Sequence, residues 1–568
     1  MSNTKRFTED DKKRFNGTVE HVEDADAESR KKLQFVDVDE QLVVAEGEEK
    51  AGHSLHCIRM CNSRCSWIHG ECCVFPPAQS DYCTVWCYET GIIGSITVSV
   101  GNDLGGKPLA ASNKEVITAM TTAGAFVCSI FAGALSDKIG RKWVLVISDI
   151  CYCVGTVIFG ASYSVAQAAV GRLILGFGVG FSSCIGPMYI SEISPTRIRG
   201  KLVAINSVTI TFGQMVSYGV GAGLLHAPEG WRIMLVIGAV PAIYQAIAIH
   251  FLPESPRYLL SHSHTEKAYN AFARVYENAS KEELALKFDL LVANVDESVR
   301  VSQQSSTWQL YKSLVTVPKN ARPLSLAMCL QAVQQLSGFN GLAYFAPTLF
   351  QQLGFENAPT GGLVIAATNF VFTGVGMFLI DRIGRRKLVV GVSAPGIILG
   401  CVWCIVSFYY LTESTNFRLA DNGAYDSGRQ IAVIIGFVAY VGFYAVGLGI
   451  VPWLQNELFS LDVRGVGTGI ATSTCWGCNL AISESYLTMQ ESITPHGTFA
   501  LFAGFVTLGW SYLLFCYPET AGLPLEEVQN LFIDGYNVRK SVVMSREKKR
   551  ASRAAASKKD ATLTPASV

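Results

Sequence analysis

Residues 137–142 read DKIGRK, and residues 381–386 read DRIGRR. Both stretches place Asp, Gly and Arg at the same spacing, 244 positions apart (381 minus 137). Each is a short polar loop between two apolar runs of about twenty residues, the length that crosses a bilayer. One loop present at two places predicts that the chain contains a duplicated membrane-spanning unit.

Two further motifs recur in the same order along the chain. The interval is 265 positions for both (452 minus 187, and 518 minus 253), which fits a longer loop after the ninth apolar run. The recurring residues are Pro187, Glu192, Arg199 and Gly200, matched by Pro452, Glu457, Arg464 and Gly465, and Pro253-Glu254, matched by Pro518-Glu519. Three motifs at matching places strengthen the case for duplication.

The composition excludes an ordinary soluble protein. The 568 residues are 49% hydrophobic and only 16% charged, with a formal net charge of zero. Charge gathers in 1–50, 253–322 and 518–568, and long apolar segments lie between these stretches. This distribution is typical of a polytopic membrane protein.

We therefore expect an all-α polytopic membrane protein with 12 transmembrane helices, arranged as two pseudo-symmetric six-helix bundles. The expected spans are 83–101, 114–136, 143–163, 166–190, 202–225, 231–252, 324–350, 360–380, 388–411, 430–455, 466–489 and 497–517. The expected domains are a largely disordered cytoplasmic segment 1–82, bundles 83–252 and 323–518, a linker 253–322 with short helices, and a tail 519–568.

Lys and Arg in the short loops predict the orientation. They are concentrated after spans 2, 4, 8 and 10, whereas the loops after spans 1, 3, 5, 7 and 11 hold a single Lys. We expect the first set, the linker and both termini to be cytoplasmic, in a multi-pass protein of the plasma membrane.

Seven of the 17 cysteines crowd into 57–87. Their spacing matches no standard zinc pattern, so a metal site is possible there but is not our expectation. No nucleophile–base constellation is evident, and we expect no enzyme activity, catalytic residue, cofactor or nucleic-acid partner.

One expected span is unusually polar. Residues 331–345 read QAVQQLSGFNGLAYF, and three glutamines at i, i+3 and i+4 share one helix face. An unpaired amide in hydrocarbon costs several kcal/mol, so this face must meet a partner helix or a water-filled cavity. Two interpretations remain open: helix–helix adhesion, and a face that binds a polyol through amide donors and acceptors.

The repeated loops carry acids as well as bases. In each half, paired acids and arginines would latch the cytoplasmic helix ends in one state and separate in another. The alternative is that the basic residues only fix the orientation in the membrane. The latch candidates are Asp137, Arg141, Glu192 and Arg199, and in the second half Asp381, Arg385, Glu457 and Arg464.

Residues 83–536 resemble the major facilitator superfamily, in its sugar porter family. The resemblance lies in the two loops above, Gly171-Arg172, the PESPR stretch 253–257, QQLSGFN at 334–340, Val451-Pro452-Trp453 and Pro518-Glu519-Thr520. The phrases GLVIAATNFVFT (362–373) and GLGIVPWLQNELF (447–459) are most similar to the fungal proton-coupled myo-inositol transporters.

The resemblance implies a midplane binding site between the two halves and alternating access. The implied polyol contacts are Gln214, Gln334, Gln335, Asn340, Asn369, Trp453, Trp476 and Asn479. It also implies proton coupling through Glu89 and Arg172, and the alternative is a static ion pair that orders spans 1 and 4.

The expected function is symport of myo-inositol with protons by a monomer in a lipid bilayer. The alternatives are a hexose carrier, coupled or passive, and a non-transporting sugar or polyol sensor. Three departures from the family pattern stand out: the segment CCVFPPAQSDYCTVWC (72–87), Cys475 before Trp476, and Glu484 in span 11.

Overall fold

The computed structural model describes residues 88–548 and 550, apart from 195–198, 277–279, 304–306, 356, 420–424, 461–462, 522 and 524. The expected disordered segment 1–82 and the cysteines of 57–87 therefore lie outside the described residues. Every regular element in the described part is a helix.

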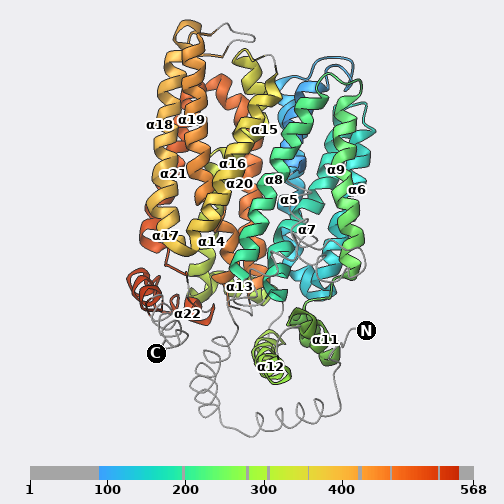
Figure 1. The fold of residues 1–568 in the computed structure, drawn as a ribbon, viewed down its shortest axis with the longest axis vertical. Coiled ribbons are helices and arrows are strands. Elements are labelled where there is room, and N and C mark those ends of the chain that lie inside the picture. The colour runs from blue at the N-terminus through green and yellow to red at the C-terminus, as the bar shows by residue number, and fades with distance from the viewer. Residues whose placement is uncertain are drawn as a thin grey trace, which may run out of the picture.

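Two helical bundles stand side by side (Figure 1). The first comprises a helix over 88–99, α5 (Ala111–Ile139), α6 (Arg141–Gly160), α7 (Val165–Ile193), α8 (Arg199–Leu224), α9 (Gly230–Ala248) and η1 (Ile249–Phe251). The second comprises α14 (Pro318–Leu336), α15 (Phe339–Gln352), α16 (Ala358–Ile383), α17 (Arg385–Leu388), η2 (Val389–Ser393), α18 (Ala394–Thr412), η3 (Glu413–Thr415), α19 (Ser427–Val446), η4 (Val451–Glu457), α20 (Arg464–Ser492) and α21 (Pro495–Cys516).

Each of the twelve expected spans thus has a helical counterpart. Eight helices in the described part are individually long and apolar enough to cross a membrane. Their outward faces carry large apolar side chains such as Val157, Phe251 and Phe515, which are 69%, 73% and 79% exposed. Such exposure is expected where lipid, not water, surrounds the protein.

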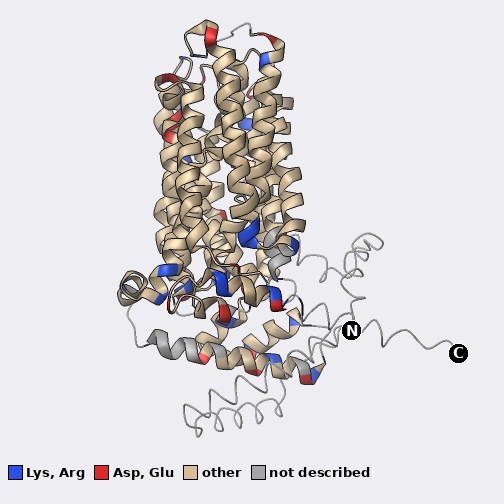
Figure 2. Cartoon of the chain, turned by 90° about the vertical axis from the view of Figure 1, so that its left-hand side faces the viewer, with Lys and Arg blue, Asp and Glu red and all other residues tan. Residues whose placement is uncertain are grey.

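The linker lies across one end of the two bundles (Figure 1). It forms α10 (Pro256–Ser261), α11 (Thr265–Val275), α12 (Lys281–Gln303) and α13 (Thr307–Thr316), and α22 (Leu525–Asn530) lies at the same end. Tyr269 and Phe288 meet edge to face at 5.2 Å inside a small apolar core between α11 and α12. We call this end of the molecule the linker end and the opposite one the far end. Figure 2 shows much of the described Lys and Arg near the linker end.

The two bundles contact each other most intimately along α5 and α20. A Cβ atom added at Gly133 would lie 2.3 Å from the carbonyl oxygen of Gly465, so the backbones approach closely. Toward the far end the hydroxyls of Thr122 and Ser483 lie 3.3 Å apart. Small residues at such a seam permit the close helix packing that stabilises proteins in lipid.

Two expected spans are broken, at places where the sequence has glycine or proline. Span 324–350 divides at Gly338, which has φ +87° and begins α15 after α14 has ended. Span 430–455 divides after Val446, and the seven-residue 3₁₀ helix η4 follows. Glycine tolerates the left-handed conformation, and Pro452 cannot donate a helical hydrogen bond, which explains both breaks.

Candidate functional site

A cavity of about 60 Å³ lies between the two bundles near the broken helices. This space is sufficient for a few water-sized groups. The structure brings all eight of the expected polyol-contact residues to its wall. They are Gln214 on α8, Gln334 and Gln335 on α14, Asn340 on α15, Asn369 on α16, Trp453 on η4, and Trp476 and Asn479 on α20.

The amides of α14 and α15 are held in fixed orientations. Gln334 donates to the carbonyl oxygen of Leu448 at 2.8 Å, inside the break of span 10. Gln335 donates to the sulfur of Cys475 at 2.9 Å, and Asn340 donates to the side-chain oxygen of Gln335 at 2.5 Å. Cys475, a departure from the family pattern, therefore orients a cavity amide.

Gln331 serves a different purpose from its two neighbours on the same helix face. It is fully buried and does not line the cavity. Its amide donates to the carbonyl oxygen of Pro452 at 3.3 Å and to Gln455 at 3.0 Å. The helix-joining interpretation thus applies to Gln331, whereas Gln334 and Gln335 face the cavity while also bonding to Leu448 and Cys475. Polyol binding by this face stays a prediction.

Two cavity residues connect the bundles directly. Asn369 donates to the side-chain oxygen of Gln214 at 3.1 Å, from the second bundle to the first. Trp476 donates to the hydroxyl of Ser183 at 3.0 Å and packs within the apolar cluster of the first bundle. A change at the cavity can therefore be transmitted to the contact between the halves.

The cavity also contains polar atoms that no group in the described part of the chain satisfies. Asn479 donates to the hydroxyl of Tyr344 at 3.2 Å, but its side-chain oxygen is buried without a hydrogen-bond partner. The hydroxyl of Ser207 is in the same situation. Buried polar atoms are rarely left unsatisfied, so these two atoms are well suited to meet the hydroxyls of a ligand.

Other lining residues were not anticipated from the sequence. Phe339 and Tyr444 stack at 4.2 Å between ring centroids and form an aromatic wall. The only sequence signal for three of them is their position in or beside a motif. Phe339 and Tyr344 belong to the polar stretch 331–345, and Thr90 follows Glu89. The unanticipated lining residues are Thr90, Ser207, Ile210, Thr211, Phe339, Tyr344, Thr373, Tyr444 and Gly449.

Glu89 and Arg172 form a buried ion pair in the first bundle. The guanidinium Nη1 lies 2.7 Å from Glu89 Oε1, and the two side chains are 1% and 2% exposed. Arg172 Nε also donates to the carbonyl oxygen of Ile117 at 3.2 Å, and Tyr152 donates to Glu89 Oε2 at 3.5 Å. Glu89 directly precedes Thr90 in the cavity wall, so the pair lies one residue away from the candidate ligand site.

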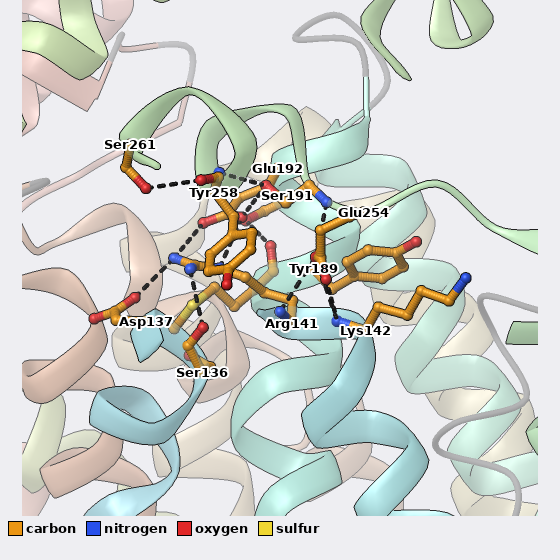
Figure 3. Close-up of polar contacts among 12 residues, drawn as sticks. Ser136, Asp137, Arg141, Lys142, Tyr189, Ser191, Glu192, Glu254, Tyr258 and Ser261 are labelled. Carbon is orange, nitrogen blue, oxygen red and sulfur yellow. Dashed lines mark hydrogen bonds and ion pairs between the residues drawn. The ribbon is translucent and has the colours of Figure 1, made fainter. Parts of the chain in front are cut away.

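Arg141 is the centre of the polar cluster at the linker end of the first bundle (Figure 3). Its guanidinium lies 2.9 Å from Asp137 and 3.1 Å from Glu192. Ser255 donates to Glu192 at 2.5 Å and so ties the start of the linker to the same cluster. Asp137 also lies against α20 of the second bundle, because a Cβ at Gly465 would be 3.0 Å from its carboxylate.

The second bundle repeats this cluster in part. Arg385 lies 2.6 Å from Glu457 and donates to the carbonyl oxygen of Thr520 at 3.0 Å. Arg464 donates to the carbonyl oxygen of Phe459 at 3.2 Å. The side chains of Arg199 and Asp381, the remaining latch candidates, lie outside the described residues.

Each repeated loop has an acidic partner whose role the sequence did not reveal. Glu254 accepts the backbone N–H groups of Arg141 and Lys142 at 3.2 Å, and Glu519 accepts that of Arg385 at 2.9 Å. The loop glycines have φ of +98° and +102°, and a Cβ on either would lie 2.5 Å from the acid's Oε2. Burial raises the pKa of the Glu254 carboxyl, although backbone donors and Arg141 lower it. These acids satisfy the free N–H groups at the starts of α6 and α17.

A further contact joins the two bundles at the far end. The backbone N–H and the hydroxyl of Thr488 on α20 both donate to Glu115 on α5, each at 2.9 Å. Glu115 is only 3% exposed. Glu484, noted as a departure in the sequence, lies one turn before Thr488 and is exposed.

Comparisons with known proteins agree with this geometry. The family model described as "Sugar (and other) transporter" matches residues 80–532. Myo-inositol transporter 1 of Cryptococcus neoformans is 42% identical over 461 residues, which cover 81% of either chain. Myo-inositol transporter 1 of Saccharomyces cerevisiae is 41% identical over 465 residues, covering 81% of this chain and 79% of the relative.

Solved structures show the same fold. The proton:xylose symporter XylE bound to 6-bromo-6-deoxy-D-glucose superimposes with a TM-score of 0.69 at 23% identity, covering 81% of this chain and 98% of that one. A partially occluded inward-open form of XylE from E. coli gives a TM-score of 0.64. The helices therefore have the arrangement of the major facilitator superfamily.

Proposed function

The chain belongs to the sugar transporter family, and on that premise we propose that it carries myo-inositol together with protons across a membrane by alternating access. It is a multi-pass membrane transporter and not an enzyme. The observation that supports this proposal most strongly is the cavity between the bundles, lined by six amides and two indoles. Amides both donate and accept hydrogen bonds, as a ring of hydroxyls requires, and aromatic faces pack on its C–H surfaces.

Relatives named as myo-inositol transporters, at 41–42% identity, favour inositol over hexose as the substrate. We assign the polyol contacts to Gln214, Gln334, Gln335, Asn340, Asn369, Trp453, Trp476 and Asn479. The free side-chain oxygen of Asn479 accepts a substrate hydroxyl in this proposal, and the Ser207 hydroxyl provides a second contact. Gln214 and Asn369 lie on opposite bundles. A bound polyol would replace their mutual hydrogen bond and would itself hydrogen-bond to both bundles.

Proton coupling resides in Glu89 and Arg172 in this proposal. A proton on Glu89 removes the negative charge that holds the guanidinium, and Arg172 keeps its bond to the carbonyl oxygen of Ile117. The protonated and deprotonated forms then favour different access states. One charge that moves through ~100 mV yields ~2.3 kcal/mol, sufficient for roughly 40-fold accumulation.

Alternating access requires contacts that break on either side of the cavity. At the far end these are the Glu115–Thr488 contact and the hydrogen bond from the Tyr218 hydroxyl to the carbonyl oxygen of Ala343. At the linker end they are the Arg141 and Arg385 clusters and the bond from Tyr311 to the carbonyl oxygen of Ile130. We propose that bundles 83–252 and 323–518 rock about the cavity as these contacts alternate.

We also propose that the linker end faces the cytoplasm, that both termini are there, and that the protein works as a monomer in the plasma membrane. The basic loops at the linker end support this orientation by the positive-inside rule. The lining residues of one chain enclose the cavity, so a monomer is sufficient for the proposed transport.

Uptake of labelled myo-inositol and glucose into cells that lack their own carriers tests the proposed function. We expect accumulation of myo-inositol that a protonophore abolishes. Uptake of glucose alone would refute the substrate assignment, and accumulation that resists the protonophore would refute proton coupling.

A further inference from the structure

A second buried acid lies in the first bundle, apart from the Glu89–Arg172 pair. Asp149 on α6 accepts a hydrogen bond from the amide of Gln245 on α9, at 2.7 Å. The two residues are 3% and 2% exposed. The other oxygens of this pair, Asp149 Oδ2 and Gln245 Oε1, are both buried without any hydrogen-bond partner among the residues that the structure describes.

Two unsatisfied acceptors on paired side chains indicate a missing proton. A proton on Asp149 Oδ2 would let this atom donate to Gln245 Oε1, so that acid and amide exchange two hydrogen bonds. Both unsatisfied oxygens would then be satisfied at once. A carboxylate would instead leave the two acceptors unmatched and a negative charge within the membrane-spanning part of α6.

No cation in the described residues compensates a charge on Asp149. The groups near it are Cys153 on its own helix, Gln245 on α9 and, toward the linker end, His250. Lys142 donates to the carbonyl oxygens of His250 and Leu252, at 3.0 and 3.1 Å. On the α7 side the neighbouring hydroxyl of Ser148 donates to the carbonyl oxygen of Gly178, which is uncharged. The surroundings therefore favour the neutral acid.

A groove connects this acid to the linker end. It measures about 550 Å³, runs between α6 and α9 to η1, and is lined by Asp149, Val154, Ile247, His250 and Phe251, among others. Its walls are mostly apolar and include outward-facing side chains such as Ile247 and Phe251, which are 59% and 73% exposed. Asp149 thus lies at a groove on the outer face of the first bundle, apart from the substrate cavity.

We propose that Asp149 is a second proton-binding site of the first bundle, protonated in the state seen here and separate from the Glu89–Arg172 pair. On α6 it lies between Arg141, in the polar cluster, and Tyr152, which donates to Glu89. Loss of the proton sets Asp149 Oδ2 against Gln245 Oε1, and these two oxygens repel each other. The packing of α6 on α9 is then loosened in the stretch of α6 between Arg141 and Tyr152. The predicted effect of Asp149 on transport rests on the proposed symport, but the protonation state of Asp149 does not depend on that proposal.

Infrared spectroscopy of the full-length protein in lipid nanodiscs measures this proton directly. At neutral pH we expect the Asp149→Asn variant to lose one protonated-carboxyl C=O band that the parent shows. The Glu89→Gln variant should retain that band, and Gln245→Leu should shift it because the acid loses its amide partner. Identical carboxyl spectra for the parent and Asp149→Asn would overturn the proposal.

A transport measurement extends the test. Asp149→Asn mimics the neutral acid, so it should bind myo-inositol as the parent does, which shows that it folds. Its proton-driven accumulation should lose the pH dependence that the parent shows over the range in which the infrared band titrates. An unchanged pH profile would overturn the role in coupling. If the parent carried glucose instead of inositol, the proposed substrate would be wrong while the infrared result on Asp149 stood.

Discussion

At the scale of single residues, Glu89 is the most informative position. In Glu89→Gln the amide mimics the protonated acid, and the charge that holds Arg172 at 2.7 Å is gone. We expect exchange of labelled for unlabelled myo-inositol to persist, whereas accumulation falls from roughly 40-fold toward equality across the membrane. Counterflow and protonophore-sensitive uptake measure the two quantities. If the pair is static and only orders the helices, both activities decline together.

The Asn479 side chain tests the cavity itself. Asn479→Ala removes an oxygen that no protein group satisfies, so a substrate hydrogen bond worth about 1 kcal/mol should be lost. We expect KM for myo-inositol to rise about five- to tenfold. Gln331→Ala is the matched control, because Gln331 joins helices outside the cavity wall. It should lower the melting temperature and leave KM nearly unchanged, and equal KM effects of the two variants would argue against the assignment.

Residues in motifs could be anticipated, and residues outside them could not. Gln334, Gln335 and Asn340 stand in a conspicuous polar stretch within an apolar span. Thr211, by contrast, also donates to its own helix at the carbonyl oxygen of Val208, 2.9 Å away, as an ordinary helical threonine does. Nothing in a single sequence separates such a residue from one that faces a ligand.

At the scale of the elements, the break between α14 and α15 is decisive for the cavity. Gly338 has φ +87°, and a Cβ there would lie 2.3 Å from the ring of Phe502. Gly338→Ala should therefore destabilise the protein by about 1–3 kcal/mol. Thermal unfolding in detergent measures this loss. Gly504→Ala on α21 is the control, since nothing lies within 4 Å of its Cβ, and it should be neutral or slightly stabilising. Equal melting temperatures for the two variants would contradict a strained turn at Gly338.

The twelve spans were predictable because hydropathy and length determine a helix in lipid. Their interruptions were only partly predictable. Glycine and proline marked the places near Gly338 and Pro452, but whether the chain bends or breaks there depends on neighbours such as Tyr440, which donates to the carbonyl oxygen of Ser337 at 2.7 Å. The π-helical turn Val389–Ser393 left no sequence signal that we recognise.

At the scale of the whole molecule, the far-end contact sets the balance between access states. Glu115→Ala removes two hydrogen bonds between the bundles, and bonds to a charged group contribute about 1.5–3 kcal/mol each. We expect the equilibrium to shift by roughly 100-fold or more toward a form open at the far end. Distances between spin labels at exposed Lys107 and Ser492 measure this change. Glu484→Ala, one turn away, should leave the distances unaltered, and the same shift in both variants would show that charge rather than the contact matters.

Pairing between the bundles could not be predicted at this scale. The duplication indicated two similar halves but not that α5 would lie along α20, or that Gly133 would meet Gly465. These contacts join residues more than 300 positions apart, and no local pattern encodes them.

The acids that cap α6 and α17 give each half its own acid-capped loop at the linker end, so the transporter carries two related contacts there. This duplication allows the order of events to be measured. If Glu254→Ala and Glu519→Ala accelerate release of myo-inositol to the same extent, the linker-end contacts of the two halves break at the same time. Unequal acceleration in single-turnover efflux would show that one half opens before the other, although both carry the same loop motif.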